Sequence, residues 1–316
     1  MQLRRIAASA LAVSTVLFAA ACAGDDLDSD DTGTGSGGGD KAAVKISGQD
    51  FGEVQIVASM YEQLLDAEGY DASVQLVGTR DVYMGAGQFP ESVQLVPEYV
   101  GGIVDFLNTT ENGADAEPLT TPDADESIAA AQDLLEEKGI TLLDPSAAVD
   151  TNAFFVTQEF SQDQGVTKLS DLEGMSVVVA AAEDCADRTD CGKGLTDVYG
   201  IDVTEFLPLG FASADVFKSV ADGESQLGLT STTDGTLESQ GMVLLEDDKQ
   251  IQPAQNLVPA VSSQWLADNP DVEGILNDLM AALTTEKLTE LNAQVSVDRA
   301  KPEDVAKEFL ESEGLL

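Results

Sequence analysis

The order of hydrophobic and polar positions from residue 42 onward predicts strands and helices that alternate along the chain. Apolar residues at 43–47 are typical of a short strand, and those at 54–69 recur at helical spacing until a glycine ends the pattern. A second strand is predicted at 72–77. Because a strand, a helix and a strand joined by short links form the βαβ unit of a parallel sheet, the pattern predicts an α/β fold.

The same alternation continues to the C-terminus. Further strands are predicted at 94–99, 140–144, 152–157, 175–180, 225–229, 242–245 and 257–262. Helices are predicted at 101–107, 125–138, 195–199, 216–221, 270–283, 286–294 and 302–313. A pause near residue 150 divides these elements into two α/β lobes. We expect residues 42–149 with 263–316 to form the first lobe and residues 150–262 to form the second.

The N-terminus has the pattern of an export signal. Two arginines precede an apolar run from Ile6 to Ala21 that is short for a membrane span. The run ends in Ala19-Ala20-Ala21-Cys22, which resembles a bacterial lipobox. We therefore expect residues 1–21 to be a signal peptide and Cys22 to be diacylated, with a plain cleaved signal as the alternative. The mature protein would then be exported and anchored by lipid to the outer face of the bacterial cell membrane.

Residues 22–41 form a lipidated flexible linker in this interpretation. They are mostly Asp, Gly, Ser and Thr, and Leu27 is the one large apolar residue among them. Such a segment cannot bury enough apolar surface to fold. Loose calcium binding by its aspartates is the less favoured alternative, since the segment lacks a recognisable calcium-loop pattern.

The charge of the chain restricts its partners. It has 58 acidic and 15 basic residues, a net charge of −43. This charge argues against nucleic acid, anionic membrane patches and phosphorylated ligands. It is compatible with a small cationic or zwitterionic solute, although diffuse surface acidity also serves solubility.

The chain contains no histidine. This excludes Ser-His-Asp triads, Cys-His nucleophile pairs and zinc sites that use histidine. The usual general base near neutral pH is also missing. A binding protein is therefore favoured over an enzyme, and we expect neither a cofactor nor a metal.

Two cysteines remain after lipidation of Cys22, and they flank a short loop that contains Arg188. In an exported protein, Cys185 and Cys191 are expected to form a disulfide, because two thiolates alone are a poor zinc ligand set. A stiffened loop would present Arg188 to clamp a carboxylate through its fork of donors. A surface ion pair with a neighbouring aspartate is the alternative.

Polar loops follow strands in both predicted lobes. Gly78-Thr79 follows a strand of the first lobe, and Thr230 to Gly235 follows a strand of the second. Tyr99 ends another buried strand, and its ring face is able to hold a cation, although a half-buried aromatic closing a strand is the simpler interpretation. Ligands of α/β proteins bind at the carboxyl ends of strands, so these positions predict a cleft shared by the two lobes.

Several ordered motifs resemble one family, the substrate-binding lipoproteins of ABC importers for osmoprotectants such as glycine betaine, carnitine and choline. They run from residue 44 to residue 316: Phe51 with Glu53, Gly78–Tyr83, Pro97-Glu98-Tyr99 with Gly101, Val198-Tyr199-Gly200, Ser231–Gly235, Leu244–Lys249, Leu291–Val295, and Pro302–Ala306 with Phe309-Leu310. The ordered series is more specific than any one of these motifs.

The resemblance implies a two-lobed type II periplasmic-binding fold that closes on its ligand by a hinge motion. It implies a binding protein without enzymatic activity, with ABC permease and ATPase subunits as partners. Tyr99 would be a ring of the ammonium cage, while Arg188 and Thr79 would meet a carboxylate. Asp234 and Thr233 would belong to the cleft loop of the second lobe.

The sequence departs from the family pattern at several ligand positions. Gln49, with Asp50 beside it, stands where the family has a lysine, while Asn152 and Phe217 replace tyrosines and Ser231 replaces an aromatic. We still expect the first four of these residues to contact the ligand. Each well-placed ring contributes roughly 0.5–2 kcal/mol to holding a quaternary ammonium, so these changes affect the ligand more than the fold.

Two alternatives to transport remain open from the sequence. A lipoprotein that kept the fold for ligand sensing or interaction would fit the altered cage. It would also fit the segment 84–90, which is rich in glycine and is not expected to be helical. An enzyme on the same scaffold is the least favoured interpretation.

Overall fold

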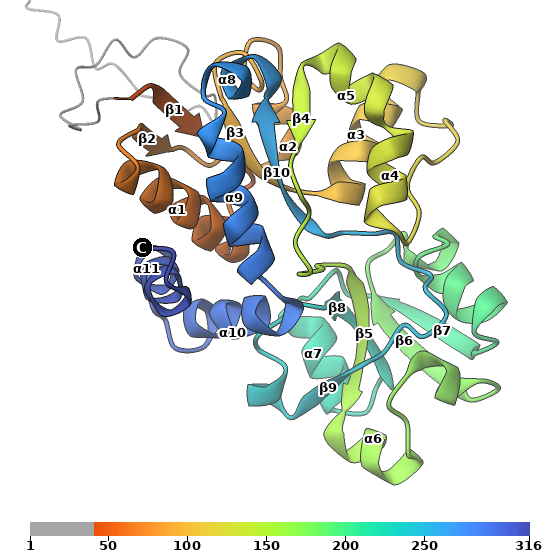
Figure 1. Cartoon of the computed structure of the whole chain (residues 1–316). Helices are drawn as coiled ribbons and strands as arrows, with labels where there is room; N and C mark the ends of the chain where they lie inside the picture. The colour runs from red at the N-terminus through yellow and green to blue at the C-terminus, as the bar shows by residue number, and fades with distance from the viewer. Residues whose placement is uncertain (1–40) are drawn as a thin grey trace, which may run out of the picture.

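The computed structural model describes residues 41–316 and shows two lobes (Figure 1). The predicted signal peptide and the lipidation of Cys22 lie outside the described residues, as does the linker up to residue 40. None of the helices within residues 41–316 combines the length and the hydrophobicity of a transmembrane segment.

The first lobe is built on a five-stranded sheet of order β2-β1-β3-β10-β4. Its strands are β1 (Ala43–Ile46), β2 (Asp71–Val74), β3 (Leu95–Tyr99), β4 (Ile140–Leu142) and β10 (Leu257–Ser262). Strands β1, β2 and β3 are parallel, as the βαβ pattern predicts, and β10 runs antiparallel to β3 and β4.

Helices cover both faces of this sheet (Figure 1). The helices of this lobe are α1 (Gly52–Ala67), α2 (Arg80–Tyr83), α3 (Val100–Asn112), α4 (Ala124–Ala130), α5 (Gln132–Lys138), α8 (Ser263–Asp268), α9 (Asp271–Ala282), α10 (Thr285–Ser296) and α11 (Pro302–Glu313). Helices α10 and α11 pack on α1. Leu95 and Tyr99 face the core formed with α1, α9, α10 and α11, while Val96 faces the core formed with α3 and α5. This alternation follows from the period of two in a strand.

The second lobe has its own five-stranded sheet, of order β7-β6-β8-β5-β9. Its strands are β5 (Asn152–Thr157), β6 (Ser176–Ala181), β7 (Asp202–Pro208), β8 (Leu227–Ser231) and β9 (Met242–Leu245). Its helices are α6 (Gln158–Gln164) and α7 (Ala214–Ala221), with short turns at Leu169–Leu172, Cys185–Asp187, Gly194–Val198 and Glu238–Gln240. Two α/β lobes, each with its own sheet and core, confirm the predicted fold class.

Two segments connect the lobes, and the second lies earlier than predicted. The boundary placed at residue 262 is wrong, because β10 lies in the first sheet, between β3 and β4. The buried run of β10 identifies a strand but does not say which sheet it joins. The two crossing segments, near residues 143–151 and 246–256, meet through an antiparallel bridge between Val149 and Asn256.

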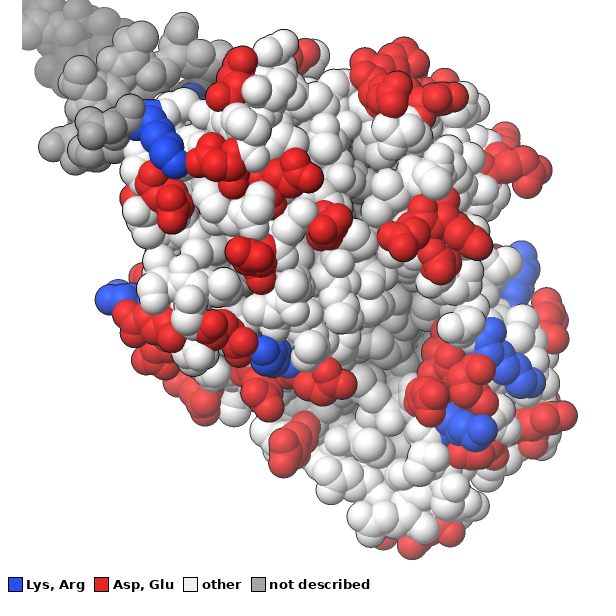
Figure 2. Space-filling view, in the orientation of Figure 1, with Lys and Arg blue, Asp and Glu red and all other residues white. Residues whose placement is uncertain are grey.

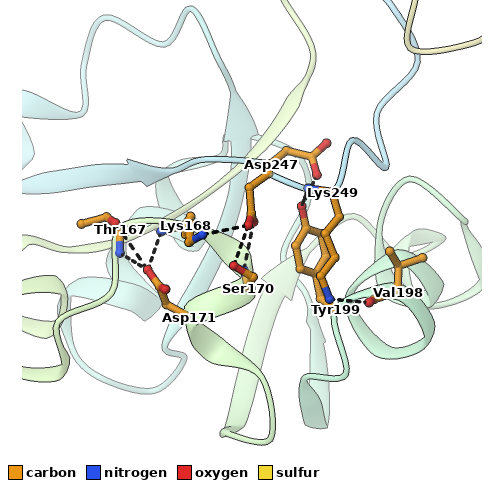
Figure 3. A network of polar contacts seen from close by, with 9 residues as sticks. Thr167, Lys168, Ser170, Asp171, Val198, Tyr199, Asp247 and Lys249 are labelled. Carbon is orange, nitrogen blue, oxygen red and sulfur yellow. Dashed lines mark hydrogen bonds and ion pairs between the residues drawn. The ribbon is translucent and has the colours of Figure 1, made fainter.

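A polar network fixes the second crossing segment to the second lobe (Figure 3). The Asp248 carboxylate accepts hydrogen bonds from the Ser170 hydroxyl at 2.6 Å and its backbone N–H at 3.2 Å, and it pairs with Lys168 at 3.2 Å. The Tyr199 hydroxyl donates to Asp247. The segment therefore leaves the second lobe from a fixed position, which suits one arm of a hinge.

Other local differences from the predicted elements have simple causes. The helix expected at 125–138 is divided at Ala131, whose ψ of 0° departs from helical geometry. Strand β7 was not predicted, since it is a half-exposed edge strand without apolar alternation. Residues 84–90 form turns, as their glycine content predicts.

Candidate functional site

A cavity of about 520 Å³ lies between the lobes. The first lobe contributes Phe51 and Glu53 at the start of α1, and α10 contributes Asn292 with the residues after it. The second lobe contributes Phe217 of α7 and the loop that follows β8. Both lobes therefore supply walls of the same cavity, as expected for a cleft that opens and closes.

Glu53 is the most deeply enclosed carboxyl group of this cavity, with 4% of its surface exposed. It accepts hydrogen bonds from the Tyr99 hydroxyl and from the Asn292 side-chain amide, each at 2.6 Å. The same amide donates to the backbone carbonyl of Thr233 at 3.0 Å. Glu53 thus belongs to a chain of contacts that runs from β3 through α10 to the second lobe.

Burial is the main reason that the pKa of Glu53 rises from its ordinary value of 4.5 to about 7. The charge of Asp150 raises it further, while hydrogen bonds from Tyr99, Asn292 and Thr233 lower it. Burial also raises the pKa of Asp150, while hydrogen bonds from the Thr233 and Ser231 hydroxyls lower it. Two carboxyl groups in one enclosed space therefore favour a cation beside them.

Tyr99 is buried, with 7% of its surface exposed, and it does not line the cavity. It lies behind Phe51 and Glu53, which both line the cavity. Its ring stacks on Phe51, with centroids 6.4 Å apart and an angle of 18° between the planes, and its hydroxyl holds Glu53. Burial raises the pKa of Tyr99 well above its ordinary value, so the phenol stays a donor.

Phenylalanine residues of both lobes line the cavity. Phe51 comes from the first lobe and Phe211 and Phe217 from the second. The Phe217 ring stacks on Phe155 at 4.7 Å between centroids, which fixes its orientation, while Phe211 is 49% exposed. Three phenylalanine rings thus stand at a cavity for which the sequence predicted one tyrosine and Phe217.

The loop after β8 holds the remaining carboxylate of the cavity. Asp234 accepts hydrogen bonds from the Thr236 hydroxyl at 2.7 Å and its backbone N–H at 2.9 Å, and the Thr230 hydroxyl also donates to it. Thr233 and Asp234 both line the cavity. The hydrogen bonds keep Asp234 in one orientation toward the second-lobe wall.

Arg188 lies outside this cavity. Its guanidinium pairs with Asp190 through two nitrogens and with Asp184 at 3.5 Å. Asn152 also donates to Asp190, at 2.9 Å. Arg188 therefore makes the ion pair that was the alternative to a carboxylate clamp, and Asn152 belongs to this ion-pair group.

Cys185 and Cys191 form a disulfide at the base of that loop, with Cα atoms 5.2 Å apart. The bond lies among buried apolar residues of the second-lobe core. It closes the loop that carries Arg188 and its partner Asp190, and so holds that ion pair beside the core.

Three other predicted site residues also lie outside the cavity lining. Gln49 bridges to Val77 beside the first sheet, and Asp50 accepts a hydrogen bond from Gln55 at 2.7 Å. Thr79 is the exposed residue before α2 and makes no capping hydrogen bond. The structure thus groups Asp234, Thr233 and Phe217 in one cavity and places the other predicted residues elsewhere.

A buried ion pair next to Tyr99 was not predicted. Glu98 is 1% exposed and accepts hydrogen bonds from two Arg80 nitrogens, each at 2.9 Å, as well as from the Tyr83 hydroxyl and the Tyr99 backbone N–H. The Arg80 guanidinium lies against Gly102, where a Cβ atom would be 2.5 Å from it. Glu98 thus fixes the end of β3. Gly102, which leaves room for the Arg80 guanidinium, was the sequence signal that could have indicated this ion pair.

The described residues show no group of three or more acidic or cysteine side chains that could hold a metal ion. Acidic side chains are spread over both lobes on the face in Figure 2. The cavity itself offers carboxyl groups, aromatic rings, hydroxyls and an amide, which suits non-covalent binding of a small solute.

The comparisons with known proteins agree with this geometry. The family described as "Substrate binding domain of ABC-type glycine betaine transport system" matches residues 42–312. A glycine-betaine-binding protein of Pseudomonas aeruginosa is 25% identical over 284 residues, covering 86% of this chain and 88% of the relative. A carnitine transport binding protein of Listeria monocytogenes is 24% identical over 285 residues, covering 88% and 89%.

The fold is also that of a solved structure titled as a glycine betaine/carnitine/choline ABC transporter. That structure has a TM-score of 0.74 and 21% identity, and the match covers 86% of this chain and 98% of the solved one. Proteins of the matching family bind a small solute for an ABC transporter and are not enzymes, so a membrane permease is the implied partner. The chain therefore belongs to the family of substrate-binding domains of ABC-type glycine betaine transport systems.

Proposed function

We propose that this protein is a lipid-anchored receptor that captures a quaternary ammonium solute between its lobes and delivers it to an ABC permease with its ATPase subunits. The cavity between the lobes is the binding site in this proposal. The solute would be a compound of the betaine, carnitine or choline kind, as the names of the relatives suggest.

One observation carries the proposal: aromatic rings and carboxyl groups line the same cavity. Phe51, Phe211 and Phe217 line the cavity, and Glu53 and Asp150 add negative charge to the same lining. A quaternary ammonium cannot donate hydrogen bonds, so it is held by ring faces and by opposite charge. In this proposal, the three phenylalanine rings contact the ammonium group in place of the tyrosines of the family pattern.

The hinge geometry supports capture and release. The lobes are joined by two segments that pair at Val149 and Asn256, and each lobe has a separate sheet. Rotation about this pair would separate Phe51 from Phe217 and open the cavity. The permease would then receive the solute from the open form.

Calorimetric titration of the mature protein with glycine betaine, carnitine, choline and amino acids tests the proposal. We expect saturable binding of at least one quaternary ammonium compound, weakened by Phe217→Ala. Phe160→Ala is the matched control, since this ring packs against the second-lobe core and not the cavity. An absence of binding across the whole panel would contradict the proposal.

The membrane anchor is proposed on the lipobox alone. Mass spectrometry of the protein isolated from membranes is expected to show a diacylated N-terminal Cys22. The variant Cys22→Ser is expected in the soluble exported fraction. Retention of this variant on the membrane would contradict lipid anchoring.

A further inference from the structure

The charged groups of the cavity all have the same sign. Glu53, Asp150 and Asp234 line it, and none of the described lining residues is a lysine or an arginine. The other polar lining groups are hydroxyls, backbone groups and the Asn292 amide. An ammonium group is attracted by this lining, whereas a carboxylate on the solute would meet no positively charged side chain.

Arg188, a predicted site residue, and Arg80, which follows the predicted site residue Thr79, both pair with carboxylates of the protein. Arg80 pairs with the buried Glu98 through two nitrogens, and Arg188 pairs with Asp190 and Asp184. Neither arginine lines the cavity. Removing Arg80 from Glu98 would leave a buried carboxylate without its counter-charge, so this guanidinium is not free to turn toward a solute.

Two oxygen atoms of cavity residues also favour a positively charged solute. Within residues 41–316, Asp150 Oδ1 and Asn292 Oδ1 are buried and have no hydrogen-bond partner. Both belong to lining residues of the cavity. Buried acceptors without donors favour a positive group beside them and disfavour another acceptor.

We infer that the solute is a net cation that carries an ammonium group and no carboxylate, so that the cavity selects choline-like over betaine-like compounds. This inference rests on the proposed function and narrows the class of solute at the same site. Selection arises from rejection of the carboxylate as much as from attraction of the ammonium group, because like charges in an enclosed cavity repel strongly.

Choline and glycine betaine provide a direct test. Both carry a trimethylammonium group. Choline has a hydroxymethyl group where glycine betaine has a carboxylate. Calorimetric titration of the mature protein at pH 7.5 is expected to show at least about 10-fold tighter binding of choline, a difference of about 1.4 kcal/mol. Equal or tighter binding of glycine betaine would overturn the inference and leave the proposed function standing. Failure of both compounds and of the rest of the panel would instead contradict the proposed function.

A charge variant tests the stated cause. Asp150→Asn keeps the shape of the side chain and removes one negative charge, so we expect the choline-to-betaine preference to fall several-fold. Asp163→Asn is the matched control, because Asp163 is exposed on α6 away from the cavity. An unchanged preference in Asp150→Asn, with native circular dichroism, would contradict the role of the cavity charge. If Asp150→Asn fails to fold, the choline-to-betaine preference of the unaltered protein still tests the inference.

One exposed arginine offers a further check. Arg299 lies three residues after Ser296, which is at the end of the cavity lining, and it is not itself a lining residue. We expect Arg299→Ala to leave both affinities unchanged. A loss of glycine betaine binding alone in this variant would show that Arg299 receives a carboxylate and would overturn the inference.

Discussion

The buried carboxyl group of Glu53 is expected to make the stability of this protein depend on pH. Burial raises its pKa from 4.5 to about 7, so the folded protein holds this proton more tightly than the unfolded chain does. A raised folded-state pKa contributes stability that is fully present below about pH 4.5 and is lost as the pH rises through about 7. The free energy of unfolding should therefore fall between pH 5 and pH 8.

The size of the pKa shift sets the size of the effect. A rise from 4.5 to about 7 corresponds to about 3 kcal/mol of unfolding free energy across this pH range. Glu53 has 4% of its surface exposed, so solvent screens it little. Asp150 shares the cavity and raises the pKa of Glu53, so Asp150→Asn is expected to reduce the dependence on pH.

Urea denaturation followed by far-ultraviolet circular dichroism at pH 5, 6, 7 and 8 measures this effect. We expect the unfolding free energy of Glu53→Gln to change less with pH than that of the unaltered protein. Asp163→Asn, with its exposed side chain, is expected to follow the unaltered protein. Parallel pH profiles for Glu53→Gln and the unaltered protein would refute the assignment of this titration to Glu53.

Three further outcomes are expected. Choline affinity should rise from pH 6 to pH 8, because a cation favours the ionised form of Glu53, and titration of Glu53→Gln should give a flatter profile. Replacement of Glu98 by Leu should reduce the unfolding free energy by about 3–5 kcal/mol, because it leaves the Arg80 charge unpaired in a largely enclosed position. Urea denaturation should show that part of this loss is recovered when Arg80 is also replaced by Leu. An absence of recovery would contradict the pairing. Replacement of Cys185 and Cys191 by Ser should lower the unfolding free energy by about 2 kcal/mol, as expected for a short closed loop, and should leave the ligand affinity unchanged, because neither residue lines the cavity.

Much of the fold was accessible from the sequence because its signals are local. The apolar spacing from Val54 to Leu65 identifies a helix whose inner face is buried. The run Leu95 to Tyr99 identifies a buried strand, and the structure buries all five of its residues. Each pattern reports how a segment meets a core, and that property repeats with the period of the helix or strand.

The candidate site was less accessible because its contacts join distant parts of the chain. Tyr99 was predicted as a ring of the ammonium cage, whereas in the structure it ends β3 and lies behind Phe51 and Glu53. For Arg188, the sequence left open a ligand carboxylate or an ion pair with a neighbouring aspartate, and nothing in the loop sequence showed that Asp190 would be its partner. Phe211 gave no signal, because an isolated phenylalanine in a loop is ordinary.

The sequence alone determined the alternation of strands and helices, the division into two α/β lobes and the membership of the family. The strands and helices were predictable because burial imposes a period on residues that are close in the chain, whereas the family followed from the resemblance of the ordered motifs. The tertiary structure decided that β10 returns to the first sheet, and that Asn292 reaches Glu53 across 239 positions. It also decided that the lining of the cavity carries only negative charge. These properties depend on how the lobes and the C-terminal helices come together, and no local period in the sequence encodes that arrangement.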